Sequence, residues 1–272
     1  MFKALTIAGS DSGGGAGIQT DLKTFAALGV YGTSVITALT AQNTKGVHGI
    51  HAVPADFVAC QMEAVLSDIP VQAAKTGMLG ETKLILTVVE LLNQYQLHNL
   101  VVDPVMVAES GDRLLQEDAI DALRTKLLPL ALVVTPNLSE AGFLLKREIT
   151  TVRDMISAAY DIYQLGPRCV LVKGGHLAGE EMVDIFYDGH TMHRFSEKKI
   201  ATIHTHGTGC TYAAAITAEL AKGLSPLAAV TNAKRFITAA IAHGVAIGSG
   251  YGPTNPMGAL LEELKNARVA QK

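Results

Sequence analysis

The residues best suited to chemistry lie in one short segment, Thr205-His206-Gly207-Thr208-Gly209-Cys210-Thr211, which directly precedes a run of small residues typical of a helix. The glycines allow consecutive backbone N–H groups to point outward, and the amino terminus of a helix adds about half a positive charge. This combination suits an oxyanion or a phosphoryl group in transfer. Cys210 falls in the first helical turn, where we expect a lowered pKa and a partly ionised thiol. The alternative is a small buried cysteine at a helix start, and the neighbouring glycines favour the functional interpretation.

Polar residues also follow the ends of several predicted strands. They read Gly9-Ser10-Asp11, Lys75-Thr76-Gly77-Met78, Asp103-Pro104, Thr135-Pro136-Asn137-Leu138-Ser139-Glu140 and Lys173-Gly174-Gly175. Any one of them alone is compatible with an ordinary turn, because Asp, Asn and Gly favour turns. Together, at one rim of a sheet, they indicate a site for a charged ligand.

Three other chemical interpretations are disfavoured by spacing. The glycine-rich segment 13–17 is followed by Ile18, which does not fit the dinucleotide fingerprint, and no Gly-Lys-Ser/Thr follows for a phosphate-binding P-loop. His204 and His206 alternate, but no third ligand stands at zinc spacing. A cysteine hydrolase built from Cys210 and His206 is disfavoured because residues four apart across a glycine turn point poorly at each other. No carboxylate is evident to orient the histidine.

The elements that must position these residues alternate between short apolar strands and helices. Such alternation predicts a parallel sheet covered on both faces, and the segment after residue 182 predicts an antiparallel hairpin at the sheet edge. We expect an α/β, doubly wound, three-layer sandwich whose ligands bind beyond the carboxyl ends of the strands. The expected strands are 4–8, 33–41, 71–75, 100–103, 132–134, 169–173, 183–187 and 191–195, and the expected helices are 17–28, 56–66, 81–95, 117–128, 152–165, 211–221 and 226–243.

Composition narrows the class of protein. Of 272 residues, 49% are apolar and 17% are charged, so a large core is available and disorder is excluded. A net charge of −3 argues against a nucleic-acid partner, and the lack of a long apolar run argues against a membrane span. Three cysteines are too few for a disulfide scaffold, and Cys60 and Cys169 are expected in the core, so we expect a cytoplasmic protein. Even apolar density without a linker favours a single domain over 1–272.

Taken in order, these motifs resemble the hydroxymethylpyrimidine/phosphomethylpyrimidine kinases of thiamine biosynthesis, members of the ribokinase superfamily. The resemblance covers essentially the whole chain and is specific in combination. It rests on residues 8–19, Lys75-Thr76-Gly77-Met78, Val102-Asp103-Pro104-Val105-Met106, Thr135-Pro136-Asn137-Leu138 with Glu140, Val172-Lys173-Gly174-Gly175 and residues 205–211.

The resemblance implies an ATP- and Mg²⁺-dependent enzyme that phosphorylates 4-amino-5-hydroxymethyl-2-methylpyrimidine and then its monophosphate. Phosphoryl transfer is mainly positioning and charge stabilisation. Cys210 would accept or hydrogen-bond the hydroxymethyl proton, and Gly207, Thr208 and Gly209 would supply amides to the phosphoryl group. By the same resemblance, the remaining roles are pyrimidine binding by Gly9, Asp21, Gln42, Met78 and Val105, ATP binding by Asn137, Lys173 and Thr205, and a Mg²⁺–water shell on Asp103 and Glu140.

The nearest alternative is a pyridoxal kinase of the same fold, or dual activity, since both substrates are flat heteroaromatics with a hydroxymethyl group. Gln42 favours the pyrimidine because an amide offers both a donor and an acceptor. A non-catalytic sensor is disfavoured, because Asp103, Lys173 and Cys210 are all present. The resemblance also implies a homodimer. The chain departs from the family pattern at Glu109, at Ala213 and over 254–256, which leaves lid closure and late-chain contacts open.

Overall fold

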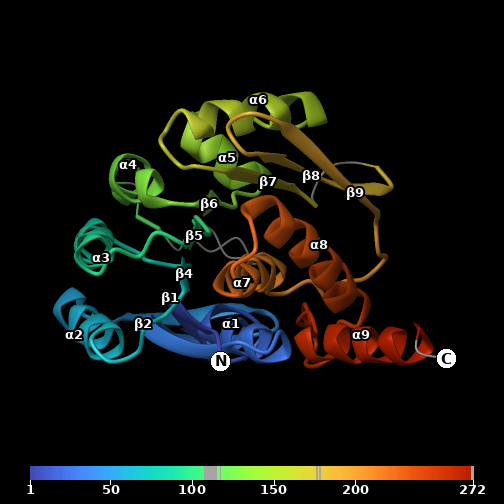
Figure 1. Ribbon diagram of the computed structural model, residues 1–272, viewed down its shortest axis with the longest axis horizontal. Helices are drawn as coiled ribbons and strands as arrows, with labels where there is room; N and C mark the ends of the chain where they lie inside the picture. Colours follow the sequence, from blue (N-terminus) through green and yellow to red (C-terminus); the bar gives the residue numbers. More distant parts are fainter. Residues whose placement is uncertain (107–114, 117, 176, 178, 271–272) are drawn as a thin grey trace.

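The computed structural model describes residues 1–106, 115–116, 118–175, 177 and 179–270. The described strands form one sheet in the order β3-β2-β1-β4-β5-β6-β7-β8-β9 (Figure 1). The pairs from β2 through β1, β4, β5 and β6 to β7 are parallel, whereas β3 pairs antiparallel with β2, β8 with β7 and β9 with β8. The strands are β1 Lys3–Asp11, β2 Tyr31–Asn43, β3 Gly46–Ala52, β4 Ala73–Thr76, β5 Leu100–Val102, β6 Val133–Val134, β7 Val170–Gly174, β8 Glu181–Tyr187 and β9 Met192–Lys198.

Helices cover both faces of this sheet, which confirms the three-layer α/β expectation. One face carries α2 to α6 and the other carries α1, α7, α8 and α9 (Figure 1). The helices are α1 Gly17–Ala27, α2 Ala55–Leu66, α3 Thr82–Gln94, α4 Ala119–Ala122, α5 Leu138–Leu145, α6 Val152–Tyr163, α7 Thr208–Ala221, α8 Pro226–Ala242 and α9 Pro256–Ala270. None of these helices is long and apolar enough to cross a membrane.

The alternation of side chains along each central strand explains the two cores. In β5, Leu100 and Val102 join the core under α2 to α6, whereas Val101 joins the core under α7 and α8. Because both faces of a parallel strand are buried, such a strand reads as a continuous apolar run. The core under α7 is rich in alanine, and the residues from Thr211 to Ala221 are all buried.

Four features differ from the expected elements. The edge hairpin of β8 and β9 is confirmed, but a second hairpin, β2 with β3, forms the opposite edge. Helices α5 and α9 were not expected. The helix expected over 117–128 is instead the short α4, then a π-helical turn over Leu123–Leu127 and a 3-10 turn over Leu128–Leu130, where Pro129 ends it.

Backbone pairing continues beyond the ends of the parallel strands and brings the predicted strand-end residues together. The N–H of Asp103 donates to Thr76 O at 3.1 Å, and the N–H of Thr135 donates to Val102 O at 3.0 Å. The N–H of Lys173 donates to Pro136 O at 2.8 Å. The carboxyl edge of the sheet is therefore the place where these predicted residues meet.

Candidate active site

A buried ion pair lies at the centre of the carboxyl edge. The Nζ of Lys173 donates to Oδ1 of Asp103 at 2.9 Å, and Thr135 Oγ1 donates to the same oxygen at 3.0 Å. Burial raises the pKa of Asp103, but the ammonium groups of Lys173 and Lys75 outweigh it and leave the pKa below its ordinary value. Burial likewise lowers the pKa of Lys173, and the carboxylates of Asp103 and Glu140 outweigh it. Both partners are therefore charged at neutral pH.

A second carboxylate, Glu140, faces the same lysine. Asn137 and Glu140 form a capping box at the start of α5, since Asn137 Oδ1 accepts the Glu140 N–H at 2.9 Å and Glu140 Oε2 accepts the Asn137 N–H at 2.8 Å. Burial raises the pKa of Glu140 to about 7, with Asp103 adding to the rise and Lys173 opposing it. Two buried carboxylates that repel each other favour a bound cation between or beside them.

The amino terminus of α7 lies against this charged group. Gly207 has φ +77, and a Cβ there would collide with Gly15 O, so only glycine fits the turn. A Cβ on Gly209 would lie 3.3 Å from Lys173 Nζ and 3.7 Å from Asp103 Oδ2. Gly209, at the positive end of a helix, thus lies directly against a cation and a carboxylate. This grouping of charges suits an anion that is coordinated by a cation.

Cys210 follows in the first turn of α7, and its expected ionisation is wrong. Burial raises the pKa of the thiol to about 12. Lys75 and a backbone hydrogen bond with Gly17 lower it, but the carboxylates of Asp21 and Asp103 add to the rise. The local helix terminus is therefore outweighed by enclosure and by charges from distant elements, and Cys210 is a neutral thiol at pH 7. The residue remains partly exposed, at the mouth of the site.

Asp21 lies beneath the site and not on its surface, which corrects its expected place in the pocket lining. Its oxygens Oδ1 and Oδ2 each lie 2.9 Å from Lys75 Nζ, and Oδ2 accepts from Thr6 Oγ1 at 2.6 Å. Asp21 and Lys75 are both 0% exposed. Burial raises the pKa of Asp21. For Lys75, the Asp21 carboxylate outweighs burial and raises the pKa to about 12. At these distances Lys75 and Asp21 are both charged, and both charges act on the pKa of Cys210.

We expect Lys75→Met to lower the free energy of unfolding by about 3–5 kcal/mol, because it leaves the Asp21 carboxylate buried without its cation. The double variant Lys75→Met/Asp21→Leu should recover much of the loss, since apolar residues replace both charges. Urea unfolding at pH 7 measures all three proteins. A double variant that is less stable than Lys75→Met would contradict this account.

The same pair should give stability a defined pH dependence. The folded-state pKa of Lys75, about 12, exceeds the unfolded value of about 10.4. The stabilisation is therefore fully present below the unfolded value and is lost as pH rises through 12. Urea midpoints of the native protein should fall over this interval, and the double variant should lack this contribution.

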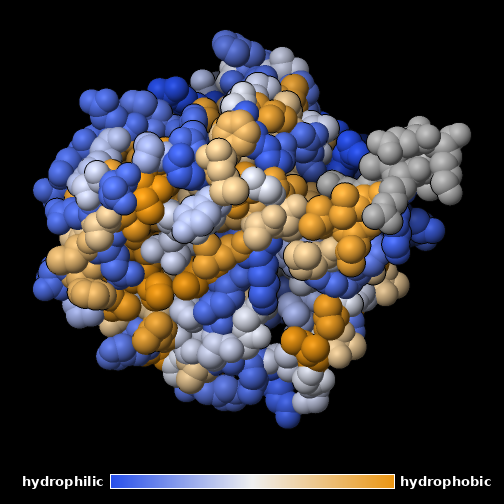
Figure 2. Space-filling view, turned by 60° about the horizontal axis from the view of Figure 1, so that its bottom comes forward, coloured by the Kyte–Doolittle hydropathy of each residue, from blue (hydrophilic) through white to orange (hydrophobic). Residues whose placement is uncertain are grey.

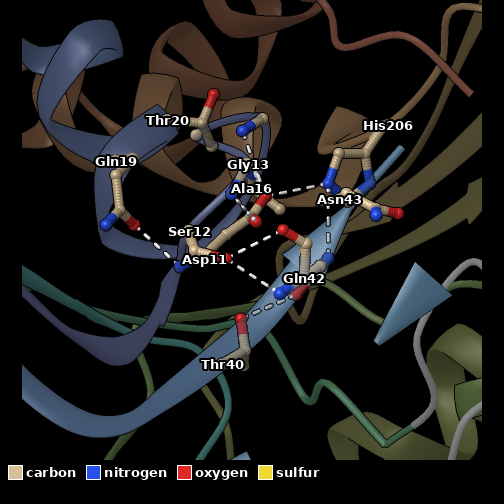
Figure 3. A network of polar contacts seen from close by, with 12 residues as sticks. Asp11, Ser12, Gly13, Ala16, Gln19, Thr20, Thr40, Gln42, Asn43 and His206 are labelled. Atoms are coloured by element: carbon tan, nitrogen blue, oxygen red, sulfur yellow. Dashed lines mark hydrogen bonds and ion pairs between the residues drawn. The ribbon is translucent and has the colours of Figure 1, made fainter. Parts of the chain in front are cut away.

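The remaining predicted residues lie at or just beyond the carboxyl ends of β1, β2, β4 and β5. A Cβ on Gly9 would lie 3.2 Å from Met78 Cε, so these two residues are neighbours. Val105 is partly exposed, and its N–H donates to Asp103 O at 2.8 Å. The side chain of Gln42 lies 3.4 Å from His206 through Nε2 (Figure 3). Glu109 lies outside the described residues.

Three other residues named in the sequence analysis are explained by their local surroundings. Thr208 Oγ1 donates to Thr205 O at 2.6 Å and closes the turn before α7. Ala213 is fully buried in the core. The departure at Thr254 is accommodated, because its N–H donates to His206 O at 3.1 Å and its Oγ1 lies 3.0 Å from Thr211 Oγ1.

The sequence analysis placed Lys75, Thr135 and Asp11 in strand-end motifs and His206 in the glycine-rich segment, but it did not predict the contacts through which these four residues organise the site. A lysine inside the buried strand β4 was a usable signal, because a buried ammonium requires a carboxylate partner. The expectation that no carboxylate orients His206 is wrong, since Asp11 Oδ2 lies 2.9 Å from His206 Nε2. Asp11 thus supplies an orienting carboxylate, and the hydrolase interpretation is disfavoured only by the positions of Cys210 and His206 four residues apart across a glycine turn.

The donor set fits a magnesium–phosphate group better than a transition metal. Within the described part of the chain, no three His, Cys, Asp or Glu residues gather to hold an ion. Mg²⁺ needs only one or two carboxylates when it keeps waters and shares phosphate oxygens. Asp103 and Glu140 provide that number, beside the lysine and the helix terminus that suit phosphate.

Comparison with known proteins agrees with this geometry. A family described as phosphomethylpyrimidine kinase matches residues 11–255. A hydroxymethylpyrimidine/phosphomethylpyrimidine kinase of Rhizobium meliloti is 53% identical over 93% of this chain and 96% of its own length. A thiamine biosynthesis bifunctional protein of Geobacter sulfurreducens is 52% identical over 92% of this chain, which spans 51% of that protein.

Among solved structures, the pyridoxal kinase of Staphylococcus aureus in complex with AMP-PCP and pyridoxal superposes with a TM-score of 0.89. It is 39% identical, and the match covers 95% of this chain and 94% of that one. The shared fold and the family match agree with the ribokinase-like expectation. The chain belongs to the phosphomethylpyrimidine kinase family.

Proposed function

We propose that residues 1–272 form a single kinase domain that uses ATP to phosphorylate 4-amino-5-hydroxymethyl-2-methylpyrimidine and then its monophosphate, in thiamine biosynthesis. The observation that carries this proposal is the close approach of Lys173 Nζ and Asp103 Oδ2 to Gly209 at the amino terminus of α7. A phosphoryl group bound beside these residues would meet backbone amides, an ammonium and a carboxylate suited to a cation. These are the parts that phosphoryl transfer needs.

On the nucleotide side, Lys173 neutralises phosphate charge, and the amides of Gly207 and Gly209 stabilise the group in transfer. The N–H of Thr208 instead donates to Thr205 O at 3.0 Å, which corrects its expected role. Asn137 and Thr205 contribute polar contacts to ATP. Mg²⁺ supplies charge neutralisation between phosphates when it is bound, and Asp103 and Glu140 would hold its water shell. Burial raises the pKa of Glu140 to about 7, and a cation bound beside that carboxyl would lower the pKa and keep it ionised.

On the pyrimidine side, Gly9, Met78 and Val105 line the pocket, and Gln42 hydrogen-bonds the aminopyrimidine edge. Cys210 contacts the hydroxymethyl group as a neutral thiol that orients the attacking oxygen. A loose transition state for phosphoryl transfer needs little basic assistance, so a thiol with a pKa of about 12 is adequate for that task. Asp21 contributes from below by holding Lys75.

A coupled ATP assay with hydroxymethylpyrimidine, its monophosphate and pyridoxal tests the function. We expect turnover of the first two substrates and a diphosphate as the final product. Hydrolysis of ATP without phosphorylation of either pyrimidine would remove the proposal.

Pyridoxal kinase activity is the second candidate, supported by the likeness to solved pyridoxal kinases. The Staphylococcus aureus structure carries both pyridoxal and a nucleotide analogue. The same assay decides between one activity and two through the ratio of kcat/KM for pyridoxal and for the pyrimidine.

We propose further that the protein is a cytoplasmic homodimer that binds neither nucleic acid nor membranes. Its thiols at Cys60, Cys169 and Cys210 are free, which suits a reducing compartment. Strand β3 is an edge strand of mostly exposed residues. Ile50 of β3, Leu39 of the paired strand β2 and Phe57 of α2 expose 47%, 47% and 59% of their surfaces. In Figure 2 the molecule is turned so that the bottom of Figure 1 comes forward, and apolar residues gather across the surface seen there. An edge strand with apolar neighbours suits pairing with a second copy, which light scattering measures.

A further inference from the structure

The side-chain amide of Gln42 lies between two polar groups that decide its orientation. In the structure its Nε2 is 3.4 Å from His206 Nε2, and its Oε1 is 3.1 Å from Thr40 Oγ1 (Figure 3). The oxygen and nitrogen of an amide have nearly the same shape, so their assignment follows from the hydrogen bonds of the neighbours. Both neighbours can be assigned from their other contacts.

Asp11 fixes the proton on His206. Its Oδ1 accepts the Gly13 N–H at 2.8 Å, and its Oδ2 accepts the N–H groups of Gly15 at 3.0 Å and Ala16 at 2.9 Å. A carboxyl that accepts three backbone donors is an anion. His206 Nε2, at 2.9 Å from Oδ2, must therefore carry a hydrogen and donate it to Asp11. That nitrogen has no lone pair to offer Gln42.

Thr40 leads to the same result from the other side. Its Oγ1 lies 2.9 Å from Ser10 O, a backbone carbonyl that can only accept. The single hydroxyl proton is used there, so Thr40 presents a lone pair to Gln42. The Nε2–H of His206, donated mainly to Asp11 at 2.9 Å, therefore also faces Gln42 at 3.4 Å, and a lone pair faces Gln42 at Thr40. An amide with Oε1 toward His206 and Nε2 toward Thr40 shares that hydrogen and donates to Thr40, whereas the reverse orientation sets donor against donor and acceptor against acceptor.

We propose that Asp11 and His206 are positioning residues that hold the Gln42 amide with Oε1 toward His206 and Nε2 toward Thr40, and thereby set the specificity for an aminopyrimidine edge. An aminopyrimidine presents a donor, its amino group, beside an acceptor, its ring nitrogen. An amide pairs with both only in one order, and a reversed amide opposes both. This inference rests on the proposed function, in which Gln42 binds the pyrimidine.

The geometry also explains why the pair is rigid. The side chains of His206 and Asp11 are 15% and 3% exposed, and a Cβ on Gly15 would lie only 2.5 Å from His206 Cδ2. The imidazole is therefore packed on the glycine-rich segment. His206 directly precedes Gly207, so the same ring joins the pyrimidine side to the phosphoryl side.

The protonation state is tested first, without substrate. Nitrogen-15 NMR of the ligand-free protein, with the His206 signal assigned from its loss in His206→Gln, should show a hydrogen on Nε2 from pH 6 to 8. A neutral ring with its hydrogen on Nδ1 would overturn the proposal.

Kinetics then test the consequence. Loss of the donor in His206→Leu should raise KM for the pyrimidine about tenfold, the effect of one hydrogen bond with its unpaired partner, while kcat changes less than about threefold and KM for pyridoxal changes less than KM for the pyrimidine. His206→Gln restores a side-chain N–H and should recover most of the KM. His98→Leu, at an exposed histidine before β5, is the matched control and should leave both constants unchanged.

Equal losses in kcat and KM for His206→Leu, or no rescue by His206→Gln, would indicate a purely structural role and contradict the inference. The experiments distinguish a wrong function from a wrong orientation of Gln42. If the native enzyme fails to phosphorylate either pyrimidine, the proposed function is wrong, whereas the NMR result still decides the orientation. If the native enzyme turns over and His206→Leu keeps its KM, only the inference is wrong.

Discussion

Replacing Asp103 with asparagine should lower kcat for the pyrimidine by about a hundredfold to a thousandfold, the usual cost of removing one preorganised charge from a reaction site. Asp103 Oδ1 accepts from both Lys173 Nζ and Thr135 Oγ1, and Oδ2 lies near Gly209, where a Cβ would be 3.7 Å away. Asparagine keeps the shape but removes the negative charge. Steady-state kinetics across a Mg²⁺ titration measure the effect, and we expect the apparent Mg²⁺ requirement to rise as well.

The matched control is Asp161→Asn, which removes the carboxylate partner of Arg147. That ion pair is shorter, at 2.6 Å, but its side chains are 43% and 40% exposed. An exposed pair contributes about 0–1 kcal/mol, so we expect nearly native stability and kcat. A large loss of kcat in Asp103→Asn but not in Asp161→Asn would then be due to the burial of Asp103 and its place in the site, and not to the loss of an ion pair in general. Native kcat and Mg²⁺ dependence in Asp103→Asn would contradict the assigned role.

Asp103→Asn should also weaken the fold, because Lys173 would keep only Glu140 as a charged neighbour. Breaking a buried pair typically costs about 3–5 kcal/mol. Thermal unfolding separates this loss from catalysis: a variant that is fully folded at the assay temperature and still slow confirms the chemical role.

The central sheet was predictable because its sequence signal is strong. Strands such as β5 and β7 are buried on both faces, and they read as continuous apolar runs bounded by turn residues. Strand β3 lacked that signal. Its sequence, Gly46-Val47-His48-Gly49-Ile50-His51-Ala52, contains two glycines and two histidines, and most of its residues are exposed. Its place comes from pairing with β2, which local sequence does not encode.

Helix α5 carried a signal that was not used. The residues after β6 were interpreted as turn punctuation, yet Asn137 followed three residues later by Glu140 is the sequence pattern of a capping box. The same two side chains therefore start a helix and enter the candidate site. Asn is common both in turns and at the start of helices, so Asn137 alone does not distinguish the two.

The sequence predicts that residues such as Asp103, Lys173 and Glu140 gather at the carboxyl edge of the sheet, but it does not predict their electrostatics. Cys210 was expected to ionise because its own helix terminus is visible in the sequence. The groups that dominate its pKa, burial and the carboxylates of Asp21 and Asp103, come from other elements. Asp11 and His206 are separated by 195 positions, and only the folded chain brings them within 2.9 Å. Local sequence predicts which residues carry chemistry better than it predicts their protonation.

The protonation of Cys210 leads to a second large expected effect. Cys210→Ala should lower kcat by about tenfold to a hundredfold, because it removes the thiol that orients the hydroxymethyl group. A true general base contributes about a hundredfold to ten-thousandfold, so the expected loss lies at or below the lower end of that range. Cys210→Ser keeps a hydrogen-bonding group of similar size and should stay within about tenfold of the native kcat. Steady-state kinetics of the three proteins measure this order.

The pH dependence distinguishes an orienting thiol from a thiolate base. With a pKa of about 12, about one thiol in 100,000 is ionised at pH 7. Raising the pH from 6 to 9 multiplies the thiolate fraction about a thousandfold without approaching saturation, so a step that needs the thiolate should accelerate over this range. A step that needs only the neutral thiol should gain no pH dependence from Cys210. We therefore expect kcat profiles of the native and Cys210→Ser proteins to have the same shape between pH 6 and 9.

Alkylation gives an independent measurement of the same ionisation. Iodoacetamide reacts with thiolates, so Cys210 should react slowly at pH 7 and its rate should still be rising at pH 10. Cys60 is exposed on α2, so its expected place in the core is wrong, whereas Cys169 is buried as expected. Cys60→Ala removes the competing reaction of the exposed thiol without touching the site. If the rate at Cys210 instead reaches a plateau with a midpoint near pH 7, the thiol is ionised under working conditions. Cys210 would then act as a general base, and the positive helix terminus with Lys75 would outweigh burial and the two carboxylates.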